Sequence, residues 1–414
     1  MKADLCCSRS PVGGVHDGRC YFRQNKRLAR MMRRLEHARI PPLPVVYRRN
    51  RVTLFPDGQT FFRAFLDAIG TAESCILLEY YLIRNDITGT AVAAQLIEAI
   101  GRGVRVLLIY DYIGCVETPS SYFKALAQRG VELIPFNVPS FRRGIGWFDR
   151  RDHRKMMVID GCRAFLGGFN IGDEYAGVKP RPDRFRDVGF SVQGGAVREL
   201  IDIFKETWQM ELGRFPELPT TVCVQDANPG LGEANVAFVS GGPHQRSSYI
   251  RSAFLVNIAS ASEDLLIANP YFVPGPRIIR SLLRAARRGV RVRLLLPARS
   301  DVRLVLLVGR SSYGTLLRGG VEIYELEEEL LHAKVMLVDG ERTIIGSANL
   351  DQRSFHRNFE INGIIDSSAF GAQIRRVVER ELVAAKRVTL RGHEQRGLLT
   401  RMLEKLVNLF GWFL

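Results

Sequence analysis

An internal repeat is the feature that most constrains the fold of this chain. The segment GVRVLLI at 103–109 returns as GVRVRLL at 289–295, and RGVELIPF at 129–136 returns as GGVEIYEL at 319–326. The first pair follows stretches with helical spacing, AVAAQLIEAIGR and IIRSLLRAARR, and a helix feeding a short apolar run is typical of a βα unit. The repeat therefore predicts a duplicated α/β fold with mixed, largely parallel sheets.

The boundary between the two copies falls in the segment 214–232, which carries three prolines and two glycines. Neither a helix nor a strand runs far through such a composition. At 414 residues the chain is also long enough for two domains. We therefore expect a basic N-terminal arm at 1–48, one domain at 49–213, a linker at 214–232, a second domain at 233–390 and an amphipathic tail at 391–414.

A second repeat carries chemistry. HRKMMVID and its continuation RAFLGGFN return as HAKVMLVD and RTIIGSAN, at a constant offset of 179 residues. A single histidine on an apolar stretch would be an ordinary core or surface residue, but two copies of one pattern are difficult to explain by chance. The first copy supplies His153, Lys155, Asp160, Gly167, Gly168 and Asn170, and the second supplies His332, Lys334, Asp339, Gly346, Ser347 and Asn349.

Strand geometry predicts how these side chains lie. Side chains alternate between the faces of a strand, so the histidine and the lysine of each motif project from one face. Each Asp-Gly pair is typical of a hairpin turn, which would return the chain so that the asparagine reaches the same point. Two imidazoles, two ammonium groups and two carboxamides without metal-binding carboxylates suit a phosphate. As turn residues, the aspartates are more often structural than chemical.

The charge of +16 predicts an anionic partner, either nucleic acid or acidic phospholipid. The seven cysteines contain no C-x-x-C pair, so they resemble neither a zinc site nor a disulfide framework, and a reducing, cytosolic-side compartment fits best. The sequence shows no secretory signal and no run of about 20 apolar residues that could span a bilayer. If the protein meets a membrane, we expect it to do so from the surface.

The paired H-x-K-x-x-x-x-D motif with G-[GS]-x-N resembles the phospholipase D superfamily over residues 49 to 390. The resemblance implies two α/β sandwich domains that share one active site, with no metal or other cofactor. It also implies a phosphohistidine intermediate, with His153 as nucleophile and His332 as acid and base. Lys155, Lys334, Asn170 and Asn349 would hold the phosphate oxygens, and the motif residues Asp160 and Asp339 complete the implied catalytic set.

A carboxylate is also needed to fix the tautomer of each histidine. Members of the superfamily place it about 25 to 35 residues after the motif histidine. Asp187 lies 34 residues after His153, and Glu360 lies 28 residues after His332. We therefore expect Asp187 to orient His153 and Glu360 to orient His332, with Ser347 as a further supporting residue.

The choice of phosphodiester depends on segments outside the motif. NPYFVPG at 269–275 and SANLDQRSFHRNFEING at 347–363 resemble bacterial cardiolipin synthases, of the short type without transmembrane helices. The tail carries Leu399, Met402, Leu403, Leu406, Phe410 and Phe413 at helical spacing, which is typical either of a helix in a membrane interface or of a helix packed on the core. The basic segment 23–39 would suit lipid or nucleic acid. The arginine-rich loop 141–152 could bind either a second phosphate or the bilayer.

These features predict transfer of a phosphatidyl group between two phosphatidylglycerol molecules, which gives cardiolipin and glycerol. The expected partner is the anionic bilayer containing phosphatidylglycerol and cardiolipin, at the cytoplasmic face of the cell membrane, and no nucleic acid is expected. The alternatives are a phospholipase D hydrolase, a phosphatidyltransferase that uses phosphatidylethanolamine and, less favoured, a nuclease. The sequence leaves the oligomeric state open.

Overall fold

The structure is a computed structural model that describes residues 44–139, 149–180, 183–219, 232–243, 248–397 and 404. Several expectations fall wholly or mostly outside these residues. They are the basic arm, the centre of the linker, the arginine-rich loop before the first motif and the apolar positions of the tail.

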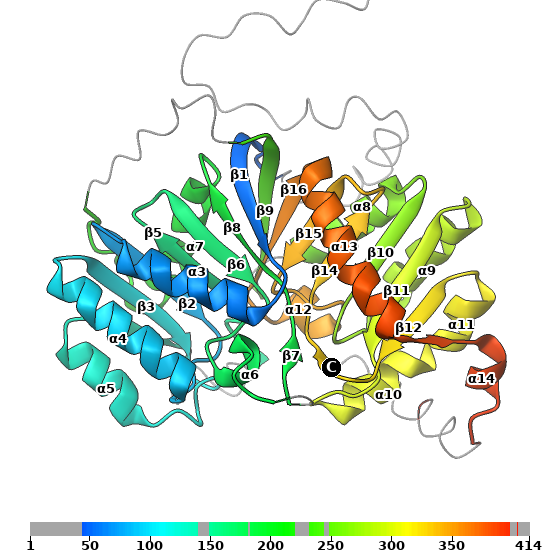
Figure 1. The fold of residues 1–414 in the computed structure, drawn as a ribbon, viewed down its shortest axis with the longest axis horizontal. Helices are drawn as coiled ribbons and strands as arrows, with labels where there is room; N and C mark the ends of the chain where they lie inside the picture. Colours follow the sequence, from blue (N-terminus) through cyan, green and yellow to red (C-terminus); the bar gives the residue numbers. More distant parts are fainter. Residues whose placement is uncertain are drawn as a thin grey trace, which may run out of the picture.

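The first copy of the repeat begins with a long strand and ends with a long helix (Figure 1). Its elements are β1 (Tyr47–Phe55), α3 (Gly58–Gly70), β2 (Cys75–Tyr80), α4 (Ile87–Gly101), β3 (Arg105–Asp111), α5 (Ser120–Gln128), β4 (Glu132–Phe136), β5 (Lys155–Ile159), β6 (Arg163–Gly167), α6 (Asp173–Ala176), β7 (Phe185–Arg186), β8 (Gly189–Gln193) and α7 (Val197–Leu212).

The second copy follows a similar order, with a second helix before β12, the short strand β13 before β14 and two short elements at its end. Its elements are β9 (Ala234–Gly241), α8 (Tyr249–Ser260), β10 (Asp264–Ala268), α9 (Gly275–Arg287), β11 (Arg291–Pro297), α10 (Arg303–Ser311), α11 (Tyr313–Arg318), β12 (Glu322–Leu326), β13 (Leu330–Leu331), β14 (Val335–Val338), β15 (Arg342–Gly346), α12 (Gln352–His356), β16 (Glu360–Asp366), α13 (Ser368–Ala384), β17 (Lys386–Val388) and α14 (Leu390–Glu394).

The strands of both copies join into one 15-stranded sheet in the order β17-β12-β11-β10-β14-β15-β16-β9-β1-β8-β6-β5-β2-β3-β4. This confirms the duplicated α/β fold but corrects the expected predominance of parallel pairing. Within this sheet, parallel pairs are confined to β2-β3-β4 and β10-β11-β12, where helices cross between strands. The other neighbouring pairs are antiparallel, because hairpins and the β1–β9 junction make the centre of the sheet.

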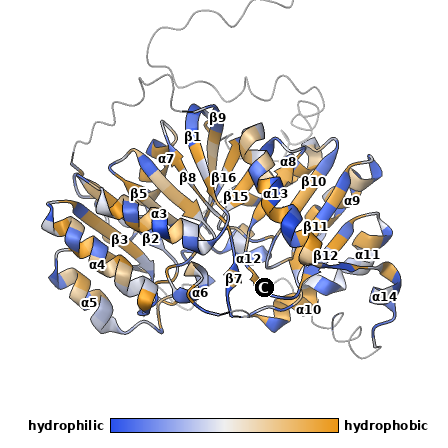
Figure 2. Cartoon of the chain, in the orientation of Figure 1, coloured by the Kyte–Doolittle hydropathy of each residue, from blue (hydrophilic) through white to orange (hydrophobic). Residues whose placement is uncertain are grey.

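Three apolar clusters divide the helices among layers. The strands of both halves pack with α7 and α13 in one cluster, which includes Phe204 and Phe370. The outer faces of the two halves are covered separately, by α3 and α4 in the first and by α8 and α9 in the second. Figure 2 shows the hydrophobic colouring concentrated on the strands between these helices. The shared central cluster holds the two halves in a fixed relation, as a site between them requires.

Both motif hairpins form as expected. Asp160 and Gly161 have φ values of 51° and 64°, and Asp339 and Gly340 have φ values of 51° and 73°. Positive φ at two successive turn residues is typical of a tight hairpin, and aspartate and glycine tolerate it. The turns return β5 into β6 and β14 into β15 by antiparallel pairing.

Each turn aspartate also binds the backbone of a neighbouring segment. The Asp160 carboxylate accepts hydrogen bonds from the N–H groups of Glu73, Ser74 and Cys75, at 2.8 to 3.0 Å. Asp339 does the same with the N–H groups of residues 262–264. These contacts anchor the first residues of β2 and β10, at the end of the hairpin opposite the histidine.

The described helices can be compared with the requirements for spanning a membrane. Within the ranges that the structure describes, no helix has both the length and the apolar composition needed to cross a bilayer.

The turn contacts generate a stability prediction. We expect Asp160→Ala to lower the free energy of unfolding by about 2–3 kcal/mol, because three backbone donors, two of them in part-buried hydrogen bonds, lose a charged acceptor. Asp160→Asn should lose less, since asparagine tolerates positive φ and retains one acceptor oxygen. Urea denaturation would measure both. If Asp160→Ala instead left stability unchanged and removed activity, the aspartate would have a chemical role.

Candidate active site

The two motif histidines lie where the halves meet, and each is fixed by backbone contacts to the other half. His153 precedes β5, and its N–H donates to the carbonyl of Phe359 at 2.9 Å. His332 precedes β14, and its N–H donates to the carbonyl of Arg186 at 2.8 Å. In both halves the residue directly after this acceptor is an expected carboxylate, Glu360 or Asp187.

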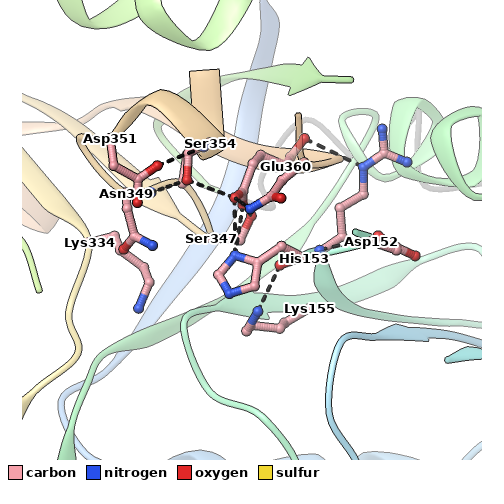
Figure 3. Close-up of polar contacts among 12 residues, drawn as sticks. Asp152, His153, Lys155, Lys334, Ser347, Asn349, Asp351, Ser354 and Glu360 are labelled. Carbon is pink, nitrogen blue, oxygen red and sulfur yellow. Dashed lines mark hydrogen bonds and ion pairs between the residues drawn. The ribbon is translucent and has the colours of Figure 1, made fainter. Parts of the chain in front are cut away.

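His153 is bound to Glu360, at the start of β16. Its Nδ1 lies 3.1 Å from both carboxylate oxygens of Glu360, as Figure 3 shows. The carboxylate also accepts hydrogen bonds from Ser347 Oγ at 2.5 Å, Ser354 Oγ at 2.9 Å and Asn358 Nδ2 at 3.2 Å. Although burial opposes ionisation, the nearby His153 and these donors hold the pKa of Glu360 below its usual value.

His332 is bound to Asp187, which lies between β7 and β8. Its Nδ1 is 2.6 Å from Asp187 Oδ2, and the N–H of Val188 donates to Oδ1 at 2.8 Å. Burial raises the pKa of Asp187 to about 6 and, with the neighbouring lysines, holds the pKa of His332 below its usual value. A carboxylate on Nδ1 leaves Nε2 as the free nitrogen of each ring.

This pairing corrects the expectation that each carboxylate serves the histidine of its own half. The partners are exchanged, so that Glu360 of the second half orients His153 and Asp187 of the first half orients His332. The physical reason is visible in the backbone contacts. Each histidine lies beside the strand entry of the opposite half, and β13 pairs with β7 just before His332.

Both motif lysines lie beside the histidines in a crowded positive site. Lys155 Nζ donates to the His153 carbonyl at 2.7 Å, and Lys334 Nζ donates to the His332 carbonyl. Burial lowers the pKa of Lys155 to about 7, and the charge of Lys334 adds to the effect. Burial also lowers the pKa of Lys334. An anion bound between the lysines would relieve this repulsion.

The two motif asparagines are buried near the ends of the returning strands. The Oδ1 atoms of Asn170 and Asn349 are buried without a hydrogen-bond partner. Buried polar atoms without partners are uncommon in folded proteins, and they are typical of positions that await a ligand. Because a carboxamide can turn to present its N–H₂, both residues suit the oxygens of a phosphate.

Asp160 and Asp339 do not join this cluster. They occupy the opposite ends of β5 and β14 and bind backbone N–H groups there, as described above. The structure therefore gives these motif aspartates contacts that stabilise the fold, in agreement with their expected turn geometry.

Sequence reasoning missed the side chains around the four central residues. Ser354 and Asn358 lie within a segment quoted above for its family resemblance, but without assigned roles. Aromatic rings also border the imidazoles. Between ring centroids, Tyr81 lies 5.0 Å from His153, and Tyr175 and Phe185 lie 5.4 and 5.1 Å from His332. No motif spacing indicates these rings, because they enter from separate loops and strands.

A buried ion pair beneath His153 was also missed. Arg154 Nη1 lies 3.2 Å from Glu79 Oε1 and 2.8 Å from Thr207 Oγ1, and Arg154 Nε donates to the Glu360 carbonyl at 3.4 Å. Arg154 and Glu79 are 1% and 0% exposed. The pair therefore lies behind the site and contacts the backbone of the residue that holds His153.

The second half has no such pair. By strand register, Glu79 opposite Met156 corresponds to Ala268 opposite Val335, and Arg154 corresponds to Ala333. Two charged residues in one half are thus replaced together by two alanines in the other. The fold is duplicated, but the two half-sites are not equivalent.

Comparison with known proteins agrees with this geometry. A family model described as "Cardiolipin synthase, PLD-like domain" matches residues 65–208 and 254–382. The crystal structure of phosphatidylserine synthase from Haemophilus influenzae Rd KW20 covers 94% of this chain and 100% of its own, with a TM-score of 0.69 at 12% identity. Fold and paired half-sites together define a phospholipase D-like protein.

Sequence relatives narrow this class. Cardiolipin synthase from Geobacillus sp. (strain WCH70) is 36% identical over 360 residues, which are 85% of this chain and 70% of the relative. Cardiolipin synthase 2 from Bacillus anthracis is 36% identical over 353 residues, which are 85% of this chain and 68% of the relative. The chain spans about two thirds of the length of such relatives, with 63% for two other Geobacillus proteins. It belongs to the cardiolipin synthase family with phospholipase D-like domains.

The buried ion pair generates a prediction on stability. Arg154→Ala alone should cost about 3–5 kcal/mol of unfolding free energy, because it leaves the Glu79 carboxylate buried without its partner. The double variant Glu79→Ala/Arg154→Ala places the alanines of the second half at these two positions and should lose clearly less than the sum of the single losses. Urea denaturation of both singles and the double gives the coupling energy. Strictly additive losses would show that the pair is not a unit.

The lowered lysine pKa values generate a prediction on pH. A lysine with a pKa of about 7 is charged below that pH and loses its charge above it. We therefore expect sulfate, a phosphate analogue that does not titrate in this range, to bind more weakly as the pH rises from 6 to 9. Isothermal titration calorimetry measures the affinity, and Lys155→Met should flatten the dependence. Affinity that stays constant or rises with pH in the unmodified protein would contradict it.

Proposed function

We propose that the protein is a phosphatidyltransferase that joins two phosphatidylglycerol molecules into cardiolipin and releases glycerol. The observation that carries the proposal is the pair of buried histidines, each bound through Nδ1 to a carboxylate of the opposite half. Two free Nε2 atoms in one positive site suit covalent transfer with proton exchange. The relatives named cardiolipin synthase support the choice of lipid.

In the first step, His153 Nε2 attacks the phosphorus of the donor phosphatidylglycerol. A phosphorus–nitrogen bond forms, and the bond from phosphorus to the headgroup glycerol oxygen breaks. His332 enters this step protonated and gives its Nε2 proton to the departing oxygen. Glycerol leaves, and the phosphatidyl group stays on His153.

In the second step, a headgroup hydroxyl of the second phosphatidylglycerol attacks the same phosphorus. Its proton passes to His332, the phosphorus–nitrogen bond breaks, and cardiolipin leaves with both histidines restored. Lys155, Lys334, Asn170 and Asn349 hold the nonbridging oxygens as charge builds on them in both steps.

Other acceptors or donors would use the same machinery. Water in place of the second lipid gives phosphatidic acid, and a phosphatidylethanolamine donor gives the same enzyme intermediate. A nuclease would share the motif and the positive charge. The family match of both halves to a cardiolipin synthase model favours the lipid reaction.

We also propose that the protein works at the cytoplasmic face of the cell membrane as a peripheral protein. The net charge of +16 supports attraction to an anionic leaflet. The basic arm and the amphipathic tail would add to this attachment.

The experiment that tests this function is expression in a bacterium that lacks cardiolipin, followed by mass spectrometry of its lipids. We expect new cardiolipin from the unmodified chain and none from His153→Ala, because the variant lacks the nucleophile assigned to the first step. Phosphatidic acid without cardiolipin would establish the hydrolase instead. Cardiolipin formed equally by His153→Ala would refute the assigned chemistry.

A further inference from the structure

The edge of the molecule that carries the two histidines exposes apolar and basic side chains. We propose that this edge is the surface with which the protein docks on a phospholipid bilayer. The inference rests on the proposed function, since it takes the substrate to be a membrane lipid, and it adds which residues of this chain meet the membrane.

Seven of the eleven exposed large apolar side chains among the described residues lie on this edge. Among the described residues, Ile87, Val116 and Val178 are 69%, 66% and 49% exposed. We define the docking rim as these three together with four further exposed residues, Tyr112, Val138, Val302 and Leu304. Single exposed apolar residues need no explanation, but a set at one edge indicates an interaction surface.

Strand register places the rim and the histidines at the same edge. The last residue of β2, Tyr80, pairs with Lys155, and the last residue of β10, Ala268, pairs with Val335. The carboxyl ends of the parallel strands therefore lie beside the motifs. The rim residues follow β2, β3, β4, β6 and β11, whose carboxyl ends all lie at this edge. In Figure 1, α6, β7 and α10 mark this edge along the lower side.

Basic side chains accompany the rim on the side of His332. Lys179 follows Val178, and Arg303 lies between Val302 and Leu304, all of them exposed. Within the part of the chain that the structure describes, neither base forms an ion pair with a carboxylate. Apolar side chains interleaved with free cations suit a bilayer that contains anionic lipid.

The depth of the histidines favours a bilayer over a protein partner. The side chains of His153 and His332 are 13% and 8% exposed, so a phosphate must enter the edge to reach them. A phospholipid holds its phosphate at the headgroup level, directly above its acyl chains. Shallow insertion of the rim would bring that phosphate to the site while the acyl chains stay in the bilayer.

The opposite edge supplies a matched control. Val45, just before β1, is 37% exposed, and Ala127, near the end of α5, is also exposed. Both precede strands that run toward the site, so they lie away from the docking rim. Aspartate at these positions changes the net charge by the same amount as aspartate at two rim positions.

The test compares the full chain with Ile87→Asp/Val116→Asp, Val302→Asp/Leu304→Asp and the control Val45→Asp/Ala127→Asp. Flotation with phosphatidylglycerol vesicles measures binding. Activity is measured on those vesicles and on a short-chain phosphatidylglycerol below its critical micelle concentration. We expect each rim variant to lose about tenfold or more in the ratio of vesicle to monomer activity, because a charge must enter the interface. The control should keep the ratio of the unmodified protein.

Rim variants that keep this ratio and float like the control would overturn the proposal. A rim variant that converts an oligomer into a monomer, measured by light scattering without lipid, would also overturn it and assign the rim to contact between copies. Failure of the proposed function looks different. The unmodified protein would then make no cardiolipin from either substrate, while flotation would still decide whether the rim binds the bilayer.

Discussion

The exchange of carboxylates between the halves is the interaction on which the site depends. Without Glu360 and Asp187, neither imidazole would have a carboxylate on its Nδ1, and burial would favour the neutral forms of both rings. Each carboxylate comes from the opposite half, so neither half contains a complete histidine–carboxylate unit. The two halves are joined by the pairing of β1 with β9 and by the core that α7 and α13 share. These contacts therefore bring the histidine–carboxylate pairs together as well as stabilising the fold.

The duplicated halves differ at matched positions around these pairs. A Cβ atom on Gly168 would lie 2.1 Å from Asp187 Oδ2, so glycine is required there by close approach. At the equivalent position, Ser347 donates to Glu360 at 2.5 Å. The shorter carboxylate thus faces the residue without a side chain, and the longer one faces a hydroxyl donor. Glycine beside aspartate and serine beside glutamate therefore both allow a carboxylate to lie against an imidazole.

The sequence predicted much of this architecture because its strongest signals are local. The alternation His-x-Lys and the Asp-Gly turns depend on neighbours in one hairpin, and both hairpins form as expected. The exchange of Asp187 and Glu360 was not predictable in the same way. Distance along the chain identified the right residues, but pairing across a pseudo-symmetric interface depends on which strand entry lies beside each histidine.

The sheet illustrates the same limit. Two βα repeats correctly indicated parallel pairing, as seen in β2-β3 and β10-β11. They do not indicate that antiparallel hairpins form the centre of the sheet. The buried Glu79–Arg154 pair gave a signal that could have been noticed. A charged residue within the apolar run ILLEYY, matched by an arginine in HRK, has no counterpart in LLIANP or HAK. Charges that are present together in one copy and absent together in the other indicate contact.

The inequality of the half-sites bears on the roles of the histidines. Glu360 receives hydrogen bonds from three further side chains, and its lowered pKa keeps it ionised beside His153. A fixed negative charge stabilises the positive ring that forms when a nitrogen bonds to phosphorus. Burial raises the pKa of Asp187 to about 6 and Asp187 accepts from fewer donors, so it stabilises a charged ring on His332 less strongly. This difference favours His153 as the covalent nucleophile and His332 as the residue that moves protons.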